Sequence, residues 1–321
     1  MSDLLVIGVC STDFIGRCVG DFPIANSLAI LSSLTIATGG NALNTAIVAS
    51  KIGLGVSLIG CIGVDYQGDF LESQMNLYNI DTRGIQRCCV HTTGSCTIMH
   101  NSKNERVFFT NKGANVELNL FKIPQFIIER ANIVVVSGLF LLTCAEKQMS
   151  SFLQNLKKQE KTIIVDTSPN VKNLPRDYID MICCSIAPYV DYFIPSEIES
   201  QIISNTYVDS EVTSVLHSKG FNNVIVKRAE KGSSISLNNG GEEYTVQAIN
   251  VPNIIDSTGA GDAFIAGFAY ALEKQYSVRD AVLCGNVLGS QCVQAMGATH
   301  GIDNNSLDLF YESVKKSKIA I

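Results

Sequence analysis

Short continuous runs of β-branched and other apolar residues alternate with amphipathic stretches along most of this chain, and this alternation constrains the fold most strongly. Strands of a parallel sheet are covered by helices on both faces, so they read as uninterrupted apolar runs. The sequence therefore predicts an α/β fold with a mostly parallel central sheet. The expected strands are 4–9, 56–62, 132–138, 162–166, 191–195 and 223–227, and the expected helices between them are 41–53, 66–78, 145–158 and 209–218.

Two segments depart from this pattern. Residues 10–38 and 88–112 contain short runs in which apolar and polar residues alternate between polar turns. A period of two is typical of antiparallel strands with one solvated face. We expect the two segments to form one small sheet, a lid inserted in a single domain that spans residues 1–321, although ordinary surface hairpins would show the same pattern.

The strands are expected to stop after residue 255. Residues 260–275 and 278–296 carry apolar side chains at helical spacing and predict two packed helices. A final helix is expected near residues 305–318, and its basic end would interact favourably with the helix dipole.

The composition indicates a globular protein of a reducing compartment. With 46% hydrophobic and 17% charged residues the chain can bury a large core, and its net charge of −6 argues against nucleic acid or an anionic membrane as a partner. The 11 cysteines show neither a C-x-x-C motif nor a zinc-finger spacing, so we expect free thiols. The most apolar stretch, 133–144, is too short to cross a bilayer, and the N-terminus reads as a strand rather than a signal peptide. We therefore expect a cytoplasmic protein.

A glycine-rich turn precedes the first of the C-terminal helices, in "DSTGAGDAF" (256–264). Gly259 and Gly261 let another group approach the backbone closely, and the start of a helix offers unpaired N–H groups that attract an anion. Asp262 would repel that anion unless it has a separate task. It is suited to take a proton from a hydroxyl group while the amides hold a phosphoryl group. A capping turn alone is the simpler interpretation of an isolated G-x-G-D.

A second dense signal lies at residues 38–44, "TGGNALN". Gly39 and Gly40 form a turn, and Asn41 and Asn44 lie one helical turn apart. Their amides offer both donors and acceptors to vicinal hydroxyl groups. Asp13 follows the first strand, where the ligand crevice of an α/β sheet is found. Taken singly, Asn41 as an N-cap and Asn44 as a solvated side chain would explain the pattern equally well.

The order and separation of these two signals resemble the ribokinase-like (PfkB) family of carbohydrate and nucleoside kinases. The resemblance covers essentially the whole chain, with the two family signatures at 39–63 and 256–268. It implies a three-layer α/β/α fold with a mostly parallel central sheet and a small β-sheet lid. It also implies ATP and Mg²⁺ as cofactors and leaves K⁺ open.

The resemblance assigns roles to individual residues. Asp262 matches the catalytic base, and Gly259, Ala260 and Gly261 match the anion hole. Asp256 and Thr258 match positions that hold a monovalent cation in many members, and Asn286 falls on the adenine side. The positions that match substrate-binding residues are Asp13, Gly39, Gly40, Asn41, Asn44, Asn115 in "NKGAN" and Asp166.

Two departures from the family pattern affect the nucleotide side. The family's N-x-x-E motif, which positions water-bound Mg²⁺, is represented here by Ser196 and Glu199. Its T-x-G-x-x-G turn becomes "KRAEKG", which keeps Gly232 but places Lys227 and Ala229 at the first two conserved positions. Lys227 either supplies a charge to a phosphate or points to solvent. Because of these departures, the sequence also allows the chain to be a non-catalytic relative that binds a ligand. A dinucleotide oxidoreductase is excluded because no G-x-G-x-x-G follows the first strand.

We expect an ATP-dependent kinase that phosphorylates a primary hydroxyl group of a small ribose- or fructose-like sugar. A nucleoside is the second alternative, because Phe14, Phe22 or Phe109 would offer a platform for a base. A sugar phosphate is the third, with cations available in the lid. The exposed lid edges also suggest a homodimer formed through the lid. The lid cations considered for the sugar phosphate are Lys103, Arg106 and Lys112.

Overall fold

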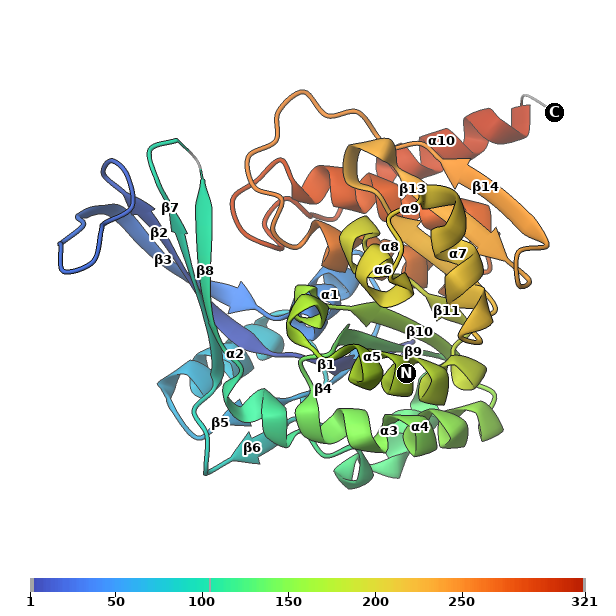
Figure 1. The fold of residues 1–321 in the computed structure, drawn as a ribbon, viewed down its shortest axis with the longest axis horizontal. Coiled ribbons are helices and arrows are strands. Elements are labelled where there is room, and N and C mark those ends of the chain that lie inside the picture. Colours follow the sequence, from blue (N-terminus) through green and yellow to red (C-terminus); the bar gives the residue numbers. More distant parts are fainter. Residues whose placement is uncertain (1–2, 104, 320–321) are drawn as a thin grey trace.

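The computed structural model describes residues 3–103 and 105–319 and contains a central sheet of eight strands (Figure 1). Its strand order is β14-β13-β12-β11-β10-β9-β1-β4, and the strands from β12 to β4 are parallel. The strands are β1 (Leu4–Gly8), β4 (Val56–Ile59), β9 (Ile133–Leu139), β10 (Thr162–Thr167), β11 (Tyr192–Phe193), β12 (Val224–Lys227), β13 (Ser233–Leu237) and β14 (Glu242–Val246). The parallel part confirms the strands expected from the apolar runs.

The sheet differs from the expectation at two places. The run at 56–62 breaks at Gly60 into β4 and a separate strand, β5 (Cys61–Gly63), which pairs with β6 (Gln86–Cys88). The antiparallel strands β13 and β14 were not expected. The edge strand β14 is polar and largely exposed, whereas β13 is mostly buried and its Ser233 and Ser236 hydroxyl groups donate to Asn286 and Glu243.

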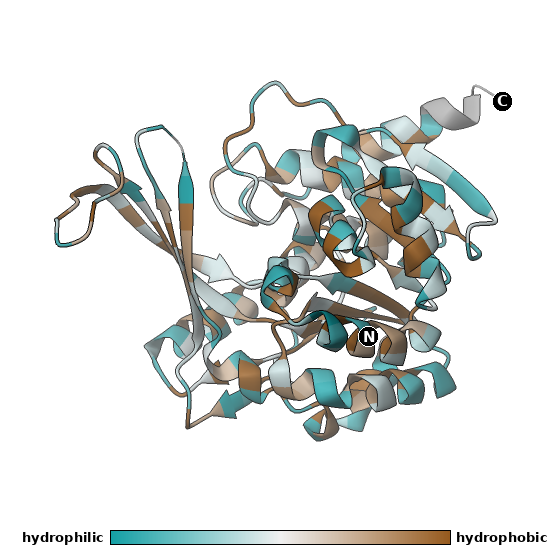
Figure 2. Ribbon diagram, in the orientation of Figure 1, coloured by the Kyte–Doolittle hydropathy of each residue, from teal (hydrophilic) through white to brown (hydrophobic). Residues whose placement is uncertain are grey.

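Helices cover both faces of the sheet, as Figure 1 shows, and the buried strands stand out as hydrophobic in Figure 2. One layer contains α1 (Asn41–Lys51), α2 (Tyr66–Leu77), α8 (Ala260–Glu273), α9 (Val278–Cys292) and α10 (Asp308–Ile319). The other contains α3 (Gln125–Arg130), α4 (Thr143–Lys158), α5 (Arg176–Ile186), α6 (Glu197–Ser204) and α7 (Asp209–Ser218). Short 3₁₀ helices lie at Gly113–Glu117, Leu120–Lys122, Pro169–Asn173, Ala187–Tyr189 and Ala229–Lys231.

The C-terminal part is helical, as the sequence predicted. Most of the expected basic end of α10 lies outside the residues whose side chains are described. Within the described part of the chain, no helix has the length and apolar character needed to span a membrane.

A second sheet projects from the body of the molecule (Figure 1). Its strand order is β3 (Leu31–Gly39), β2 (Ser11–Cys18), β7 (Gly94–His100), β8 (Arg106–Asn111), and these strands arise from the two segments with period-two patterning. β2 pairs with β7 in parallel, whereas the outer pairs are antiparallel. Along β2, Asp13 points to the inner face of this lid, toward the main body, and Phe14 points to the outer face.

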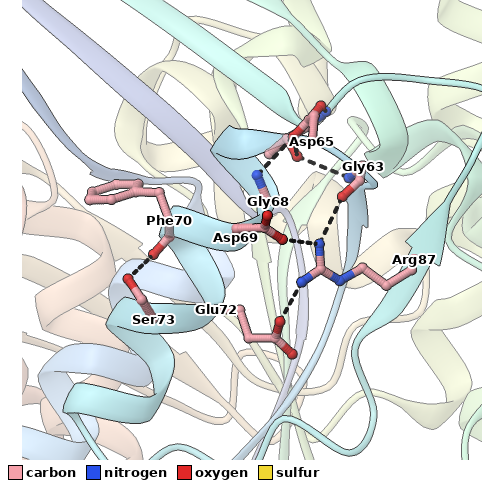
Figure 3. Close-up of polar contacts among 9 residues, drawn as sticks. Gly63, Asp65, Gly68, Asp69, Phe70, Glu72, Ser73 and Arg87 are labelled. Atoms are coloured by element: carbon pink, nitrogen blue, oxygen red, sulfur yellow. Dashed lines mark hydrogen bonds and ion pairs between the residues drawn. The ribbon is translucent and has the colours of Figure 1, made fainter.

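Asp65 ties the base of the lid to the body. Its carboxylate caps α2 by accepting from Gly68 N at 2.8 Å, and it also accepts from Thr93 N at 2.7 Å, one residue before β7. Arg87, on β6, donates to the carbonyl oxygen of Gly63 and forms ion pairs with two acidic residues of α2, as Figure 3 shows. These contacts fix where the lid leaves the main sheet.

Candidate active site

The first turns of α1 and α8 meet at the carboxyl edge of the central sheet. Asp262, in the first turn of α8, is buried, and its two carboxylate oxygens accept hydrogen bonds from Asn41 Nδ2 at 3.0 Å and Asn44 Nδ2 at 2.8 Å. The two asparagines lie one helical turn apart on α1, so both amides reach the same carboxylate. In this structure Asn41 and Asn44 therefore orient the predicted base.

The turn before α8 has the geometry of an anion site. Gly259 is the N-cap, with a φ of 80° that favours glycine, and a side chain at this position would collide with Ala298. The next residues, Ala260 and Gly261, begin the helix, whose first N–H groups have no partner within it. Asp262 thus lies in the first turn of α8, beside main-chain N–H groups that have no partner within the helix.

The carboxyl groups of Asp262 and Asp13 both have raised pKa values. Burial raises the pKa of Asp262 to about 6, although the bonds from Asn44 and Asn41 oppose the shift. Burial likewise raises the pKa of Asp13 to about 7, helped by the negative charge of Asp262. A base whose pKa lies near neutral pH is well matched to proton abstraction from a hydroxyl group.

Gly39 and Gly40 make room for Asp13. A β-carbon at Gly39 would overlap the carboxylate of Asp13, and Gly40 has a φ of 87° as its backbone passes close to Val9 and Cys10. Asp13 is buried at the start of the lid and electrostatically coupled to Asp262. The structure therefore brings both signals singled out in the sequence to one place.

Lys227 does not point to solvent. Its Nζ lies 2.5 Å from Asp166 Oδ1, and both residues lie near the carboxyl ends of strands of the central sheet, on the face toward α8. Burial lowers the pKa of Lys227, but the attraction of Asp166, Glu199 and Asp262 outweighs it, so the pKa is raised and the ammonium persists. A β-carbon on Gly261 would lie 3.4 Å from Nζ, which places this charge at the anion turn.

Ser196 and Glu199 form a capping box at the start of α6. Glu199 N donates to Ser196 Oγ, and Ser196 N donates to Glu199 Oε2 at 2.8 Å, while Thr167 Oγ1 donates to the same oxygen. The described residues contain no group of three or more His, Cys, Asp or Glu side chains placed to bind a metal directly. Mg²⁺ commonly keeps several waters and binds substrate phosphates, so the buried Glu199 fits a water-bridged ion.

Three of the residues expected to bind ligands make contacts with the protein's own backbone or pack closely against it. The Asn115 amide accepts from Cys10 N and donates to Cys10 O and Lys112 O, which pins the loop after β1. Asn286 accepts from Ser233 Oγ and donates to two carbonyl oxygens at the end of β14. Gly232 has a φ of 84° and leaves no room for a side chain against that segment.

Asp256 lies at the centre of the turn that leads to Gly259. Its Oδ1 accepts from Thr258 N at 3.0 Å and Thr258 Oγ1 at 2.7 Å, and its Oδ2 accepts from Gly297 N at 3.0 Å. Arg106, from the lid strand β8, also reaches Oδ1. The sequence analysis considered Arg106 only as a ligand of a sugar phosphate, because nothing in the sequence connects it with a residue 150 positions away.

The sequence analysis did not single out Ser137. This residue of β9 is fully buried on the sheet face toward α1 and α8, and among the described residues its Oγ has no hydrogen-bond partner. The Oδ1 of Asn44 is in the same situation. Buried polar atoms normally have partners, so both atoms have unused hydrogen-bonding capacity.

Comparisons with known proteins agree with this fold. A ribokinase of Haemophilus influenzae is 26% identical over 83% of this chain and 84% of its own length. A nucleoside kinase of Methanocaldococcus jannaschii is 25% identical over 99% of both chains. The solved structure of Arabidopsis thaliana ribokinase, complexed with ribose and ATP, superposes with a TM-score of 0.84 at 21% identity and covers 97% of this chain and 99% of its own.

A glycine turn, a buried carboxylate beside it and a lid on this fold are the features of a phosphotransferase that acts on an alcohol group. The family described as pfkB family carbohydrate kinase matches residues 1–305. The chain belongs to this family.

Proposed function

We propose that this enzyme transfers the γ-phosphoryl group of ATP to a primary hydroxyl group of a small uncharged sugar of the ribose or fructose type. One observation carries the proposal: the buried carboxylate of Asp262 is held by Asn41 and Asn44 beside the main-chain donors that open α8. A base and an anion site in direct contact are what phosphoryl transfer to a hydroxyl group requires.

In this proposal Asp262 accepts the proton of the attacking hydroxyl group, and the N–H groups of residues 259–262 bind the phosphoryl group in transit. Lys227 lies close enough to Gly261 to pair with a nucleotide phosphate, and Asp166 holds its ammonium in place. Bound Mg²⁺, held through water by Glu199, would offset phosphate charge. Positioning and charge supply most of the acceleration in this kind of reaction.

The acceptor side is polar and buried. Asp13, Ser137 Oγ and Asn44 Oδ1 are available to the hydroxyl groups of a sugar. Two of the three expected lid cations already have acidic partners, since Lys103 pairs with Asp21 and Arg106 with Asp256. This arrangement favours an uncharged sugar over a sugar phosphate.

A nucleoside is the second candidate. Phe14 and Phe109 lie in the same cross-strand row on the outer face of the lid, so they cannot provide a platform for a base inside the site. Phe108, which the sequence analysis did not name, lies on the inner face, and 54% of its surface is exposed. Its exposed ring is available for stacking with a base.

A coupled assay of ADP formation tests the proposal across pentoses, hexoses, nucleosides and hexose phosphates. We expect turnover with a plain pentose or hexose, and no loss of that turnover in Phe108→Ala. Nucleoside turnover that depends on Phe108 would assign the second candidate. No ADP formation with any acceptor, together with thermal stabilisation by a sugar, would instead indicate a non-catalytic relative that binds a ligand.

We propose further that two copies pair through their lids. The outer face exposes Leu34, Ile36 and Phe109, with 57%, 55% and 64% of their surfaces accessible, and β3 and β8 are unpaired edge strands in the chain described. A second copy would cover this apolar face and both edges. Light scattering should give a dimer for the wild type and a monomer for Ile36→Asp. A wild-type monomer at micromolar concentration would contradict the pairing.

We also propose a cytoplasmic location. All 11 cysteines, each among the described residues, are free thiols, and most are buried. Burial raises the pKa of Cys10 to about 12, so this thiol is inert as well as unpaired. Such a set of thiols is typical of a reducing compartment. Imaging of the tagged protein with compartment markers tests this location, and a signal outside the cytoplasm would contradict it.

A further inference from the structure

The carboxylate of Asp256 already has a cationic partner. The Nη1 of Arg106 donates to Asp256 Oδ1 at 3.3 Å, and its Nη2 donates to Ser257 Oγ at 3.0 Å. The side chain of Asp256 is only 2% exposed, whereas that of Arg106 is 32% exposed. The guanidinium group therefore reaches from the lid strand β8 onto a buried carboxylate.

The position of Arg106 on the lid explains this reach. On β8, Arg106 is in register with His100 of β7, which is in register with Arg17 of β2, so the three residues form a basic row on the inner face. Asp13 belongs to the same face. The row faces the turn at 256–259, and Arg106 is the member that makes the ion pair.

A monovalent cation, which the family resemblance implies at Asp256 and Thr258, does not fit this arrangement. Both oxygens of Asp256 are engaged, Oδ1 by Thr258 and Arg106 and Oδ2 by Gly297 N. A free ion at the same carboxylate would place two positive charges against one negative charge at a largely buried site. Desolvation makes such an excess of charge unfavourable.

We propose that the guanidinium group of Arg106 takes the place of the monovalent cation, so that the lid itself supplies the positive charge beside the anion hole. Arg106 is then a positioning residue, because it acts through Asp256 on the turn that carries Gly259. Only the effect on catalysis rests on the proposed kinase function. Movement of the lid away from the body would break this ion pair and leave Asp256 without a counter-charge.

The first test uses thermal unfolding, which needs no substrate. In tetramethylammonium chloride, Arg106→Ala should melt several degrees below the wild type, and KCl or millimolar guanidinium chloride should restore most of the loss. In Asp256→Asn the same two cations should have no such effect. Lys103→Ala removes another lid cation, paired with the exposed Asp21, and serves as the matched control without cation response.

The second test uses turnover at constant ionic strength. We expect the wild type to be equally active in K⁺ and in tetramethylammonium. In tetramethylammonium, Arg106→Ala should lose about tenfold in kcat/KM, as expected for a lost charge-assisted bond. K⁺ or guanidinium should restore the kcat/KM of this variant. Strong stimulation of the wild type by K⁺, or an Arg106→Ala variant that responds to neither cation in both tests, would overturn the proposal. A melting response without turnover on any acceptor would refute the kinase function and retain this inference.

Discussion

Lys227 Nζ and Asp166 Oδ1 lie 2.5 Å apart at the carboxyl edge of the central sheet, between the base and the capping box of α6. Burial raises the pKa of Asp166 to about 7, while the nearby ammonium opposes this shift. The pair therefore carries two opposite charges at pH values above about 7, where Asp166 is ionised. Replacement of either partner alone leaves a buried charge without compensation.

Lys227→Met should destabilise the protein by about 3 kcal/mol at pH 8, since removing one partner of a buried pair is costly. The loss should shrink toward pH 4. The pKa of Asp166 is raised above its usual value of 3.8, so the folded state takes up the proton more readily as the pH falls. Urea unfolding at several pH values measures the effect. Lys227→Met/Asp166→Asn should recover most of the stability, and a pH-independent loss in the single variant would contradict this explanation.

Asp262→Asn should bind sugar and nucleotide almost normally but lose turnover by about 10³-fold, because general-base catalysis contributes roughly this much. The asparagine keeps the shape of the side chain and one acceptor for Asn41 or Asn44. Calorimetric binding and steady-state kinetics separate the two effects. Asp21→Asn, an exposed change in the lid, is the control. Turnover within about tenfold of the wild type would remove Asp262 from the role of base.

The pH dependence of kcat/KM should report the free enzyme's base. The pKa of Asp262 is about 6, and the carboxylate must be deprotonated to accept a proton, so kcat/KM should fall about tenfold per pH unit below that value. The raised pKa also means that the folded protein favours the protonated form of Asp262. This group's contribution to the free energy of unfolding is therefore fully present below pH 3.8 and is lost as the pH rises through about 6. Activity that stays flat down to pH 4 would exclude Asp262 as the titrating group.

Ala229→Gly should stabilise the protein by roughly 1 kcal/mol. Ala229 has a φ of 49°, in the left-handed region that costs a residue with a β-carbon about 1–2 kcal/mol, and glycine removes most of this cost. Ala187 also begins a 3₁₀ turn but has a φ of −50°, so Ala187→Gly should destabilise. Chemical unfolding of both variants measures the difference. Equal effects of the two changes would show that backbone strain is absent at Ala229.

The sequence predicted the parallel strands and the turn at Gly259 because both depend on local patterns. β13 and β14 escaped prediction because the runs "SSISL" and "EEYTV" are too polar to read as core strands. The ion pairs of the site could not be predicted from the sequence for another reason. Lys227 and Asp166 are 61 residues apart, and their contact depends on strand order, which the apolar runs alone leave undetermined.

The parallel pairing of β2 with β7 means that the lid is built from two separate segments of the chain. The chain between these two segments, which includes α1 and α2, belongs to the body of the molecule and returns to the base of the lid before β7 begins. The lid cannot be removed or transferred as one contiguous segment. A chimera with the lid of a relative requires the replacement of both segments. It also cannot form from one contiguous segment, because residues 40–93 separate its two halves in the chain.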